Sequence, residues 1–279
     1  MEEVSSSEPS EDLSSVIGYL SVEPIKKEGG KIYFHDLNEE SETKDSLDKI
    51  KKLFKKFPRF YRFLVRMISP VVAIKGPIKR FKKLSNGTII NIGCGSAVRE
   101  RGIVNLDFID FKNVDIVADI HNLPFNDNSI DSVMSAAVLE HVRSPEIVIG
   151  EVNRILKPGG IVFTSIPFMQ PFHASPNDFQ RYTLPGIEHL HRDFEILESG
   201  VHGGPVSGFL WVLQDFISVL FSFGSYRLRN LILISLMLVT WPVKFLDLIL
   251  YRLPTSEILA SSFYIIARKS KGMGGQKRA

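Results

Sequence analysis

The sequence of 279 residues contains almost no cysteine, since Cys94 is the only one. A single thiol excludes an intramolecular disulfide, and it also excludes a zinc cluster built from several cysteines. A chain of this kind fits a reducing compartment. No activating setting for a thiol is visible around Cys94, so we interpret it as a small loop residue rather than a nucleophile.

Charge of one sign is also scarce, because 34 Lys and Arg nearly balance 31 Asp and Glu. The formal net charge of +3 does not by itself imply a nucleic-acid partner. Residues 1–8 are acidic and rich in serine, and they lack the basic start and apolar core of a secretory signal. We expect a disordered acidic tail over 1–15 and a flexible tail over 271–279.

Uninterrupted hydrophobic runs are short where the chain is most apolar. Residues 209–226 and 228–253 are dense in Leu, Ile, Val, Phe and Trp, but the longest charge-free part of the second segment has 14 residues. A helix needs about 18–20 apolar residues to span a bilayer, and Lys244 and Asp247 interrupt this run. We predict a hydrophobic helical insertion over 205–254 that does not span. Its helices either lie in a membrane interface or cover the domain's own apolar surface.

The N-terminal region, residues 16–84, combines two different patterns. Residues 17–36 alternate apolar and polar side chains around a Glu-Gly-Gly-Lys turn, which predicts a β-hairpin. Residues 45–83 carry 13 Lys and Arg interleaved with apolar residues at near-helical spacing, with a break at Pro58. A basic amphipathic helix favours an anionic membrane surface or a polyanion. The alternative is an ordinary helix that packs its aromatic stripe on the domain.

The middle of the chain alternates strands with crossovers, which is typical of a parallel sheet in an α/β domain. A helix is predicted over 145–156, because Lys157-Pro158-Gly159-Gly160 follows it as a strong stop. The predicted strands are 88–92, 103–107, 116–118, 130–135, 161–166, 194–198 and 262–267.

The most informative motif joins a glycine turn to an acidic strand end. The stretch Asn91-Ile92-Gly93-Cys94-Gly95 ends the first strand of the sheet, and Asp107 ends the next one. Glycines allow backbone amides to approach a ligand closely. A carboxylate at the tip of the following strand can accept both hydroxyls of a ribose. The pair predicts a nucleoside site, although either glycine could also serve a turn alone.

From residue 88 to 269 the chain resembles the class I S-adenosylmethionine-dependent methyltransferases, specifically the small-molecule type 11 branch. Four blocks in order carry the resemblance, namely 91–95, Asp107, 118–125, and 138–142 with 151–160. It implies a Rossmann-like sheet that is mostly parallel with an antiparallel last strand, and S-adenosyl-L-methionine as the cofactor. The cofactor-binding residues that it implies are Asn91, Gly93, Cys94, Gly95, Asp107, Asp119, Ile120, Glu140 and His141.

Two departures from the family pattern bear on activity. Asn91 stands where an acidic residue is common, and Ala97 stands where a third glycine is common. The first crossover is also near the lower limit for joining parallel strands, so its helix must be very short. These features favour the alternative of a non-catalytic scaffold that keeps the fold. Asp119 could likewise cap a turn, and Glu140 and His141 could be surface residues.

Candidate catalytic residues follow the fifth strand, at the carboxyl edge where α/β proteins bind ligands. The segment 167–183 resembles a His-x-x-Pro-x-Asp-x-x-Arg-Tyr-Thr block of type 11 members often found in glycan biosynthesis. His173 is the candidate base, because imidazole changes charge near neutral pH. Asp178 could orient it, while Arg181 or Tyr182 holds the acceptor. The alternative is a rigid lid in which Asp178 and Arg181 pair with each other. The histidines lack the spacing of zinc ligands, so we predict no metal site.

The sequence therefore predicts a methyltransferase that acts on a small-molecule or lipid- or glycan-linked acceptor near a membrane surface. We expect a methyltransferase domain over 85–204 and 255–270, separated by the insertion. We also expect a cytoplasmic location with peripheral contact to the anionic inner face of a membrane. Nucleic acid is a less favoured partner, because the basic residues lie far from 167–183 in sequence. The sequence does not specify an oligomeric state.

Overall fold

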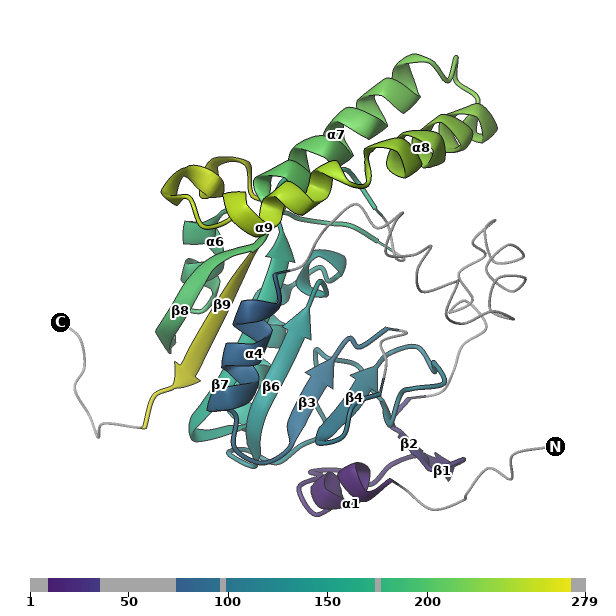
Figure 1. The fold of residues 1–279 in the computed structure, drawn as a ribbon. Coiled ribbons are helices and arrows are strands. Elements are labelled where there is room, and N and C mark those ends of the chain that lie inside the picture. Colours follow the sequence, from purple (N-terminus) through teal and green to yellow (C-terminus); the bar gives the residue numbers. More distant parts are fainter. Residues whose placement is uncertain (1–9, 36–73, 96–98, 174–176, 272–279) are drawn as a thin grey trace.

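A nine-stranded sheet with the order β1-β2-β5-β4-β3-β6-β7-β9-β8 forms the centre of the protein (Figure 1). The computed structural model describes residues 10–35, 74–95, 99–173 and 177–271. The strands are β1 (Lys26–Glu28), β2 (Lys31–Tyr33), β3 (Ile89–Ile92), β4 (Ile103–Asp107), β5 (Ile116–Val117), β6 (Ile130–Ala136), β7 (Leu156–Pro167), β8 (Phe194–Gly203) and β9 (Ser262–Lys269). The helices are α1 (Glu11–Ile17), α4 (Lys75–Leu84), η2 (Leu139–His141), α5 (Pro145–Ile155), α6 (Leu184–Leu190), α7 (Pro205–Leu220), α8 (Tyr226–Thr240), η3 (Val243–Leu246), α9 (Asp247–Leu250) and η4 (Pro254–Leu259).

The central strands β3, β4 and β6 run parallel. β3 and β4 are buried along their whole length, as expected for strands covered on both faces. Ile92 at the end of β3 pairs with Leu106, so the glycine turn after β3 lies beside Asp107 at the end of β4. The two halves of the predicted nucleoside motif therefore meet at the carboxyl edge of the sheet.

The predicted strands are confirmed, and the 103–107 prediction coincides with β4. The largest difference at a strand start is in β7, which starts at Leu156 rather than at residue 161. Its pairing with β6 moves from Ile130–Leu156 to Ser132–Ile161, so the Lys-Pro-Gly-Gly stretch forms a bulge inside the strand. The predicted helix over 145–156 is α5, which ends at Ile155.

The last strand, β9, is antiparallel to both of its neighbours, β7 and β8. This confirms the mostly parallel, Rossmann-like α/β sheet with an antiparallel last strand. The helices from α7 to η4 leave the sheet after β8 and return to it at β9. The helical insertion therefore occupies the predicted place, next to the carboxyl ends of β6 and β7 (Figure 1).

The N-terminal hairpin extends the main sheet rather than forming a separate module. β1 and β2 are antiparallel around Gly29 and Gly30, both of which have positive φ, and β2 pairs in parallel with β5.

The segment before this hairpin is ordered further toward the N-terminus than the sequence predicts. The prediction of disorder over 1–15 is wrong for residues 11–15, which belong to α1. Residues 1–9, and residues 272–279 of the predicted tail over 271–279, lie outside the described residues. Ser10 caps α1 by accepting a hydrogen bond from the Leu13 amide at 3.2 Å. Leu13 is fully buried, and such burial offsets the entropy lost when the segment orders.

Most of the basic stretch over 45–83 lies outside the described residues, which resume at Ile74. Its last turns form α4, which packs on β7 and β9. Phe81 is fully buried and meets the Phe163 ring, with 5.7 Å between centroids. Lys79 and Lys83 are exposed. α4 is therefore an ordinary helix that packs its apolar stripe on the domain and exposes its basic face to solvent. This is the second of the two interpretations of the basic stretch.

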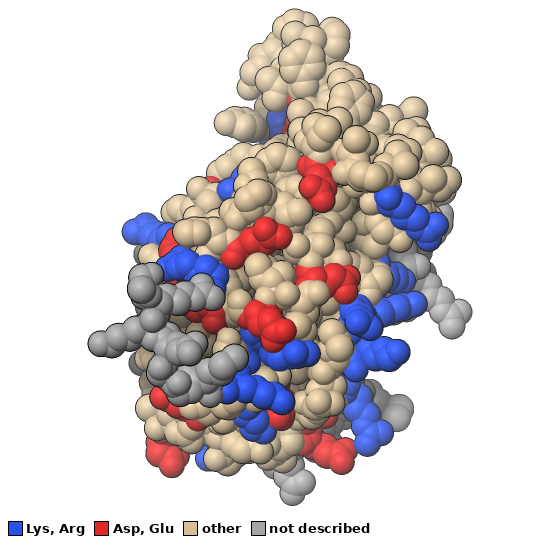
Figure 2. Space-filling model, turned by 90° about the vertical axis from the view of Figure 1, so that its left-hand side faces the viewer, with Lys and Arg blue, Asp and Glu red and all other residues tan. Residues whose placement is uncertain are grey.

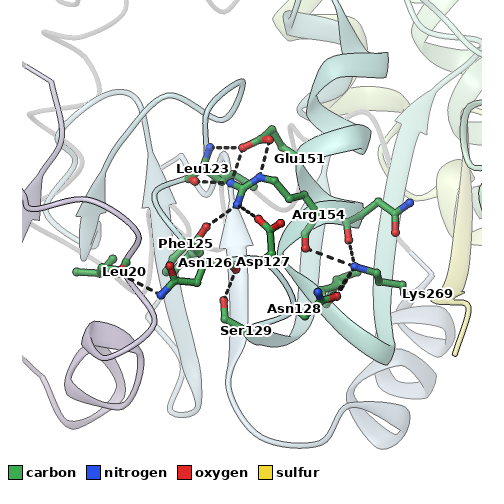
Figure 3. A network of polar contacts seen from close by, with 12 residues as sticks. Leu20, Leu123, Phe125, Asn126, Asp127, Asn128, Ser129, Glu151, Arg154 and Lys269 are labelled. Carbon is green, nitrogen blue, oxygen red and sulfur yellow. Dashed lines mark hydrogen bonds and ion pairs between the residues drawn. The ribbon is translucent and has the colours of Figure 1, made fainter. Parts of the chain in front are cut away.

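Arg154, on α5, fastens the loop after β5 to the domain (Figure 3). Its guanidinium donates to the carbonyl oxygens of Leu123 at 2.8 Å and Phe125 at 2.6 Å, and to both carboxylate oxygens of Glu151. Hydrogen bonds from Arg154 hold the pKa of Glu151 below its usual range. The loop that carries the predicted adenine-contacting residues is thus held by a charged network with good geometry.

The apolar insertion folds into a hairpin of α7 and α8 that projects beyond the sheet (Figure 1). Asp247 holds the end of this hairpin that lies next to the sheet. In the sequence, Asp247 interrupts an apolar run. The fully buried Asp247 carboxylate accepts hydrogen bonds from the Val206 and Ser207 amides, both at 2.8 Å. Amides in the first turn of a helix have no acceptor within the helix, so a residue 41 positions away from Val206 supplies the cap of α7.

The outer surface of the insertion is apolar. Figure 2 shows its upper end mostly tan, with Lys, Arg, Asp and Glu side chains gathered below it. No single described helix is both long and apolar enough to cross a membrane, whereas the pair Tyr226–Thr240 and Val243–Leu250, bent by 51°, meets the length and composition criteria together. The large exposed apolar side chains of α7, α8 and their connection are Phe209, Val212, Phe216, Val219, Leu220, Phe221, Phe223, Tyr226, Leu228, Leu231, Ile234, Leu238 and Val239.

His202, near the end of β8, should make the stability of the fold depend on pH. Its ring is buried in edge contact with Phe163 and Tyr264, and burial lowers its pKa to about 4. Because the folded pKa lies below the unfolded one, stability is complete above about pH 6.5 and is lost as the pH falls towards 4. Between pH 7 and pH 5 the protonation of this histidine should lower the free energy of unfolding by about 2 kcal/mol.

We expect His202→Phe to remove that loss, because phenylalanine keeps the aromatic packing and carries no titratable nitrogen. Urea unfolding at pH 7, 6 and 5 gives the free energy of unfolding of both proteins. This free energy should fall less steeply with decreasing pH in the variant than in the wild type. Parallel declines of the two proteins would show that His202 is not the group responsible.

Candidate functional site

Two glycines with positive φ form the turn that follows β3. Gly93 has φ of +63° and Gly95 of +54°, where residues with a Cβ are strained. A Cβ on Gly93 would lie 2.5 Å from Cγ1 of Val138, so that position has no room for a side chain. Apart from its chain neighbours, a Cβ on Gly95 would meet no atom of the described residues within 4 Å. Gly93 therefore serves packing, and Gly95 leaves an open surface for a ligand.

Asp107 lies directly beside this turn. Its Oδ2 accepts a hydrogen bond from the Gly95 amide at 2.7 Å, and its Oδ1 accepts one from the Ile109 amide at 2.9 Å. A carboxylate offers about four acceptor positions, so acceptor capacity for two hydroxyls remains. An oriented acid next to an open glycine turn has the features that a ribose site requires.

Asn91 is tied to the sheet rather than to the turn surface. Its amide donates to Oδ1 of Asn105 on β4 at 3.0 Å, and Asn105 in turn donates to the Asn113 carbonyl at 3.0 Å. Asn113 donates to the Gly95 carbonyl, also at 3.0 Å. The side chain of an aspartate at position 91 would have no N–H to begin this chain of bonds. The structure does not direct the Asn91 side chain toward a ligand, and the other departure, Ala97, lies outside the described residues.

Cys94, between the two glycines, is packed into the protein. Its side chain belongs to a small apolar cluster with Tyr33, Val114 and Val117. Burial, together with the nearby Asp107 carboxylate, raises the pKa of the Cys94 thiol to about 12. The thiolate is the nucleophilic form of cysteine, so this residue has the character of a structural thiol.

The predicted adenine-contacting segment forms a turn after β5. Oδ1 of Asp119 accepts hydrogen bonds from the His121 amide at 2.9 Å and from its ring Nδ1 at 2.8 Å. Asp119 therefore caps the turn, which is the structural alternative noted for it. Its side chain is half exposed, whereas Ile120 is buried in the main core. Contact of either residue with adenine stays a prediction.

Glu140 and His141 are not surface residues, which was the alternative to their predicted contact with the cofactor. Both follow Ala137, whose φ of +56° is unusual for a residue with a Cβ, and they lie on η2. Glu140 is fully buried, and its two carboxylate oxygens have no hydrogen-bond partner among the described residues. Burial is the main reason that the pKa of Glu140 rises to about 7.

His173, from the segment after β7, meets this pair. Its ring lies edge-on to the His141 ring at 5.6 Å between centroids. One ligating atom from each of Glu140, His141 and His173 lies within 4.8 Å of the others. Spacing along the chain gave no sign of this grouping, because it joins residues that are 32 positions apart in sequence. The absence of a metal site stays a prediction.

Asp178 and Arg181 form the rigid lid that was the alternative to their catalytic roles. The Asp178 carboxylate is paired with both terminal nitrogens of Arg181, whose hydrogen bonds hold the pKa of Asp178 down at about 2. Arg181 also donates to the carbonyls of Gln170, Pro171 and Gln180, so its donors are used within the lid rather than kept for an acceptor molecule.

The predicted orienting role of Asp178 also needs correction, whereas acceptor contact by Tyr182 stays a prediction. Asp178 accepts a hydrogen bond from the backbone amide of His173 at 2.8 Å, whereas it is 3.8 Å from ring Nδ1. It therefore positions the backbone of His173 and not the imidazole. The Tyr182 hydroxyl donates to Oε1 of Gln180 at 3.4 Å, and its ring packs against the core.

Trp211, on α7, is a site residue that sequence reasoning missed. Its ring lies 5.4 Å from that of His173, between centroids, so the insertion covers the cluster directly. Asn105, Asn113 and Arg154 were also missed as supports of the cofactor side. Arg154 could have been identified from its place in the family block over 151–160. No sequence feature indicates that Trp211 contacts His173.

The two glycines offer a matched test of the turn. Gly95→Ala should cost about 1–2 kcal/mol of folding free energy, because only the left-handed backbone is strained. Gly93→Ala should cost roughly 1–3 kcal/mol more through the contact with Val138, and adding Val138→Ala should recover part of it. Urea unfolding measures all three variants. Equal losses at positions 93 and 95 would contradict the assigned packing role of Gly93.

Comparison with known proteins bears on these residues. Residues 91–164 match the family model of a methyltransferase domain, the type 11 family. The chain is 28% identical over 144 residues to an uncharacterized chloroplastic methyltransferase of Arabidopsis thaliana, covering 40% of this chain and 41% of that protein. It is 36% identical over 78 residues to a demethylmenaquinone methyltransferase of Staphylococcus haemolyticus, covering 26% and 33%. The chain thus spans less than half the length of these curated relatives.

A solved structure, Haemonchus contortus phosphoethanolamine N-methyltransferase 2 in complex with S-adenosyl-L-methionine, is 17% identical with a TM-score of 0.41. That match covers 69% of this chain and 51% of the other. The assignment of the chain rests instead on the family match over 91–164 and on the sheet topology described above. The chain contains a class I S-adenosylmethionine-dependent methyltransferase domain of the type 11 branch.

Proposed function

We propose that this protein transfers a methyl group from S-adenosyl-L-methionine to a hydroxyl of a small, lipid-linked or glycan-linked acceptor at a membrane surface. One observation carries the proposal. Val138 packs on Gly93 of the cofactor turn, and Glu140 and His141, two and three residues later, face His173. A single short segment therefore joins the cofactor side to a cluster of groups that can handle a proton.

The cofactor side is suited to a nucleoside. The open surface at Gly95 and the backbone-held Asp107 carboxylate would hold the ribose, and the loop over 119–125 borders the same edge of the sheet. S-adenosyl-L-methionine supplies an electrophilic methyl group on a sulfonium, and the protein's main task is to align the acceptor with it.

On the acceptor side, His173 is the proposed base. Its Nδ1 lies 2.9 Å from the Pro171 carbonyl oxygen, which can only accept a hydrogen bond. The proton of the neutral ring therefore sits on Nδ1, and Nε2 carries the lone pair that can take a proton from a hydroxyl. Trp211 covers the ring and limits the access of water.

The insertion supports an acceptor that comes from a lipid phase. The helix that carries Trp211 into the site also presents Phe216 and Val219 to solvent, each about 60% exposed. The connection between α7 and α8 contains Phe223, which is 89% exposed. Apolar surfaces of this extent mark sites of contact with membranes or partners. A peripheral location on the cytoplasmic face of a membrane follows as part of the proposal.

Calorimetric titration with S-adenosyl-L-methionine tests the cofactor half. We expect micromolar binding that Asp107→Ala weakens about 10- to 100-fold, because it removes an acceptor of charge-assisted hydrogen bonds. Asp193→Ala, at an exposed position, is the control. Circular dichroism verifies folding, since Asp107 also holds two backbone amides. Full binding by a folded Asp107→Ala protein would contradict the site.

A methyl-transfer assay on His173→Ala tests the catalytic half. The variant should bind the cofactor normally, and its transfer of labelled methyl to a membrane lipid extract should fall about 10²- to 10⁴-fold. If the wild-type protein binds the cofactor but labels neither lipid nor soluble extracts, the scaffold alternative holds. The departure of Asn91 from the family pattern is the observation that favours that alternative.

Vesicle co-sedimentation tests the membrane claim. The protein should sediment with vesicles of phosphatidylcholine and phosphatidylglycerol. Phe223→Asp combined with Val239→Asp should reduce the bound fraction at least about tenfold, because charge is costly in an apolar phase. Ile25→Asp is the matched control, since Ile25 is also apolar and is 63% exposed near the N-terminal hairpin. Absence of binding, or equal loss with the control, would remove the membrane from the proposal.

A further inference from the structure

The cluster of Glu140, His141 and His173 has a donor set that the methyl-transfer proposal does not require. Two imidazoles and a carboxylate, from two separate segments, place one ligating atom each within 4.8 Å of the others. Glu140 is buried, and the two histidine side chains are 18% and 29% exposed. The cluster is therefore mostly enclosed.

Both imidazoles turn the same nitrogen toward the protein. Nδ1 of His141 lies 2.5 Å from the Asn177 carbonyl oxygen, and Nδ1 of His173 lies 2.9 Å from the Pro171 carbonyl oxygen. Carbonyl oxygens only accept, so each Nδ1 carries the proton and each Nε2 keeps a lone pair. This pattern of Nδ1–H to a carbonyl is the one that orients metal-bound histidines.

One contact needs to be reconciled with that pattern. Nη2 of Arg181 is 3.2 Å from Nδ1 of His173, and a donation there would leave Nδ1 without a proton. Nη2 has two hydrogens, and two nearer acceptors take them, namely Oδ2 of Asp178 at 2.6 Å and the Pro171 carbonyl at 3.1 Å. The tautomer with the lone pair on Nε2 is therefore the consistent one.

The Glu140 carboxylate has unmet binding capacity. Neither oxygen accepts a hydrogen bond within the described part of the chain, and Oε1 is 3.8 Å from Nε2 of His141, too far for one. Burying an ionised carboxylate without a partner is costly. A neutral acid would not resolve this, because its O–H would still need an acceptor. A cation between the three groups would satisfy all of them.

The two segments of the cluster are also held together before any ligand arrives. The Gln180 side-chain amide donates to the carbonyls of Leu139 and Val142, both at 2.9 Å, and the Phe179 amide donates to the Glu140 carbonyl at 2.8 Å. The lid, which Asp178 joins to the His173 amide, is thereby fastened to η2. Preorganisation of this kind reduces the cost of assembling a site.

We propose that Glu140, His141 and His173 bind one divalent first-row transition-metal ion. Imidazole nitrogen favours Zn²⁺, Fe²⁺, Ni²⁺ or Cu²⁺ over Mg²⁺, Ca²⁺ and Mn²⁺, which prefer oxygen ligands. Metal–nitrogen bonds of about 2.0–2.1 Å in a tetrahedral site would place the ligating atoms about 3.3 Å apart. The three groups would therefore have to move together from separations of up to 4.8 Å. Three protein ligands leave a position open, which is the pattern of catalytic rather than structural sites.

The role of the ion rests on the proposed function, but its binding does not. In a methyltransferase the open position would take the acceptor hydroxyl, whose proton the ion would make acidic enough to pass to water. Nε2 of His173 would then serve as a ligand, and its role as the base would apply to the metal-free protein. An acceptor with an oxygen that can coordinate a metal, such as a hydroxyl of a glycan or a quinol, fits such a position.

Metal titration of the purified, chelator-treated protein, without cofactor, tests the site. Calorimetry with Zn²⁺ and absorbance with Co²⁺ should both give one ion per chain, the latter with visible bands of a nitrogen- and oxygen-ligated ion. Glu140→Gln, His141→Ala and His173→Ala should each weaken binding at least about tenfold, because each removes one of three ligands. His189→Ala, at an exposed histidine of α6, should bind as the wild type does.

Glu140→Gln keeps the size of the buried side chain, and thermal melts verify that each variant folds. Absence of a Co²⁺ spectrum in the wild-type protein would overturn the proposal, and so would binding that survives Glu140→Gln and His173→Ala in folded proteins. Failure of the metal titration with normal S-adenosyl-L-methionine binding would reject the ion and leave the proposed methyl transfer intact.

Discussion

The parallel pairing of β3 with β6 is the constraint on which the site depends. It brings the glycine turn after β3 and the segment after β6 to one edge, where Val138 closes over Gly93. That contact leaves no room for a Cβ at position 93, so the approach of the two segments is as close as backbone and a valine allow. Everything that follows Val138, including Glu140 and His141, takes its position from this packing. The cofactor turn and the histidine cluster are consequently parts of one rigid arrangement.

Polar groups near the site divide into those that are satisfied and those that are not. The Asn91–Asn105–Asn113 chain and the Arg154 network have partners with good geometry, and they hold the cofactor side in place. The Asp178–Arg181 pair does the same for the lid. Glu140 stands apart, because it is buried and its carboxylate lacks a partner within the described residues. A buried carboxylate with neither oxygen satisfied is energetically costly, and this is the observation behind the proposed metal ion.

The insertion relates the site to its surroundings. Asp247 fixes the start of α7, and this helix then carries Trp211 to His173 on one side while presenting apolar side chains to solvent on the other. A single helix therefore contributes both to the acceptor side of the site and to the apolar surface of the molecule. This coupling gives the insertion a physical reason to lie between β8 and β9, where the chain passes the carboxyl edge of the sheet.

By itself the sequence determined the strands, the order of the family blocks and the glycine turn with Asp107, because these features depend on local periodicity and on residues near one another in the chain. It also located the insertion. A rigid lid was one of the two interpretations of residues 167–183. Only the tertiary structure decided that Asp178 and Arg181 satisfy each other, that Asp247 caps α7, and that Trp211 covers His173. It alone brought His173 to Glu140 and His141 and left that carboxylate without a partner among the described residues. Those facts depend on side chains far apart in sequence that meet at one sheet edge, and local spacing carries no information about such meetings.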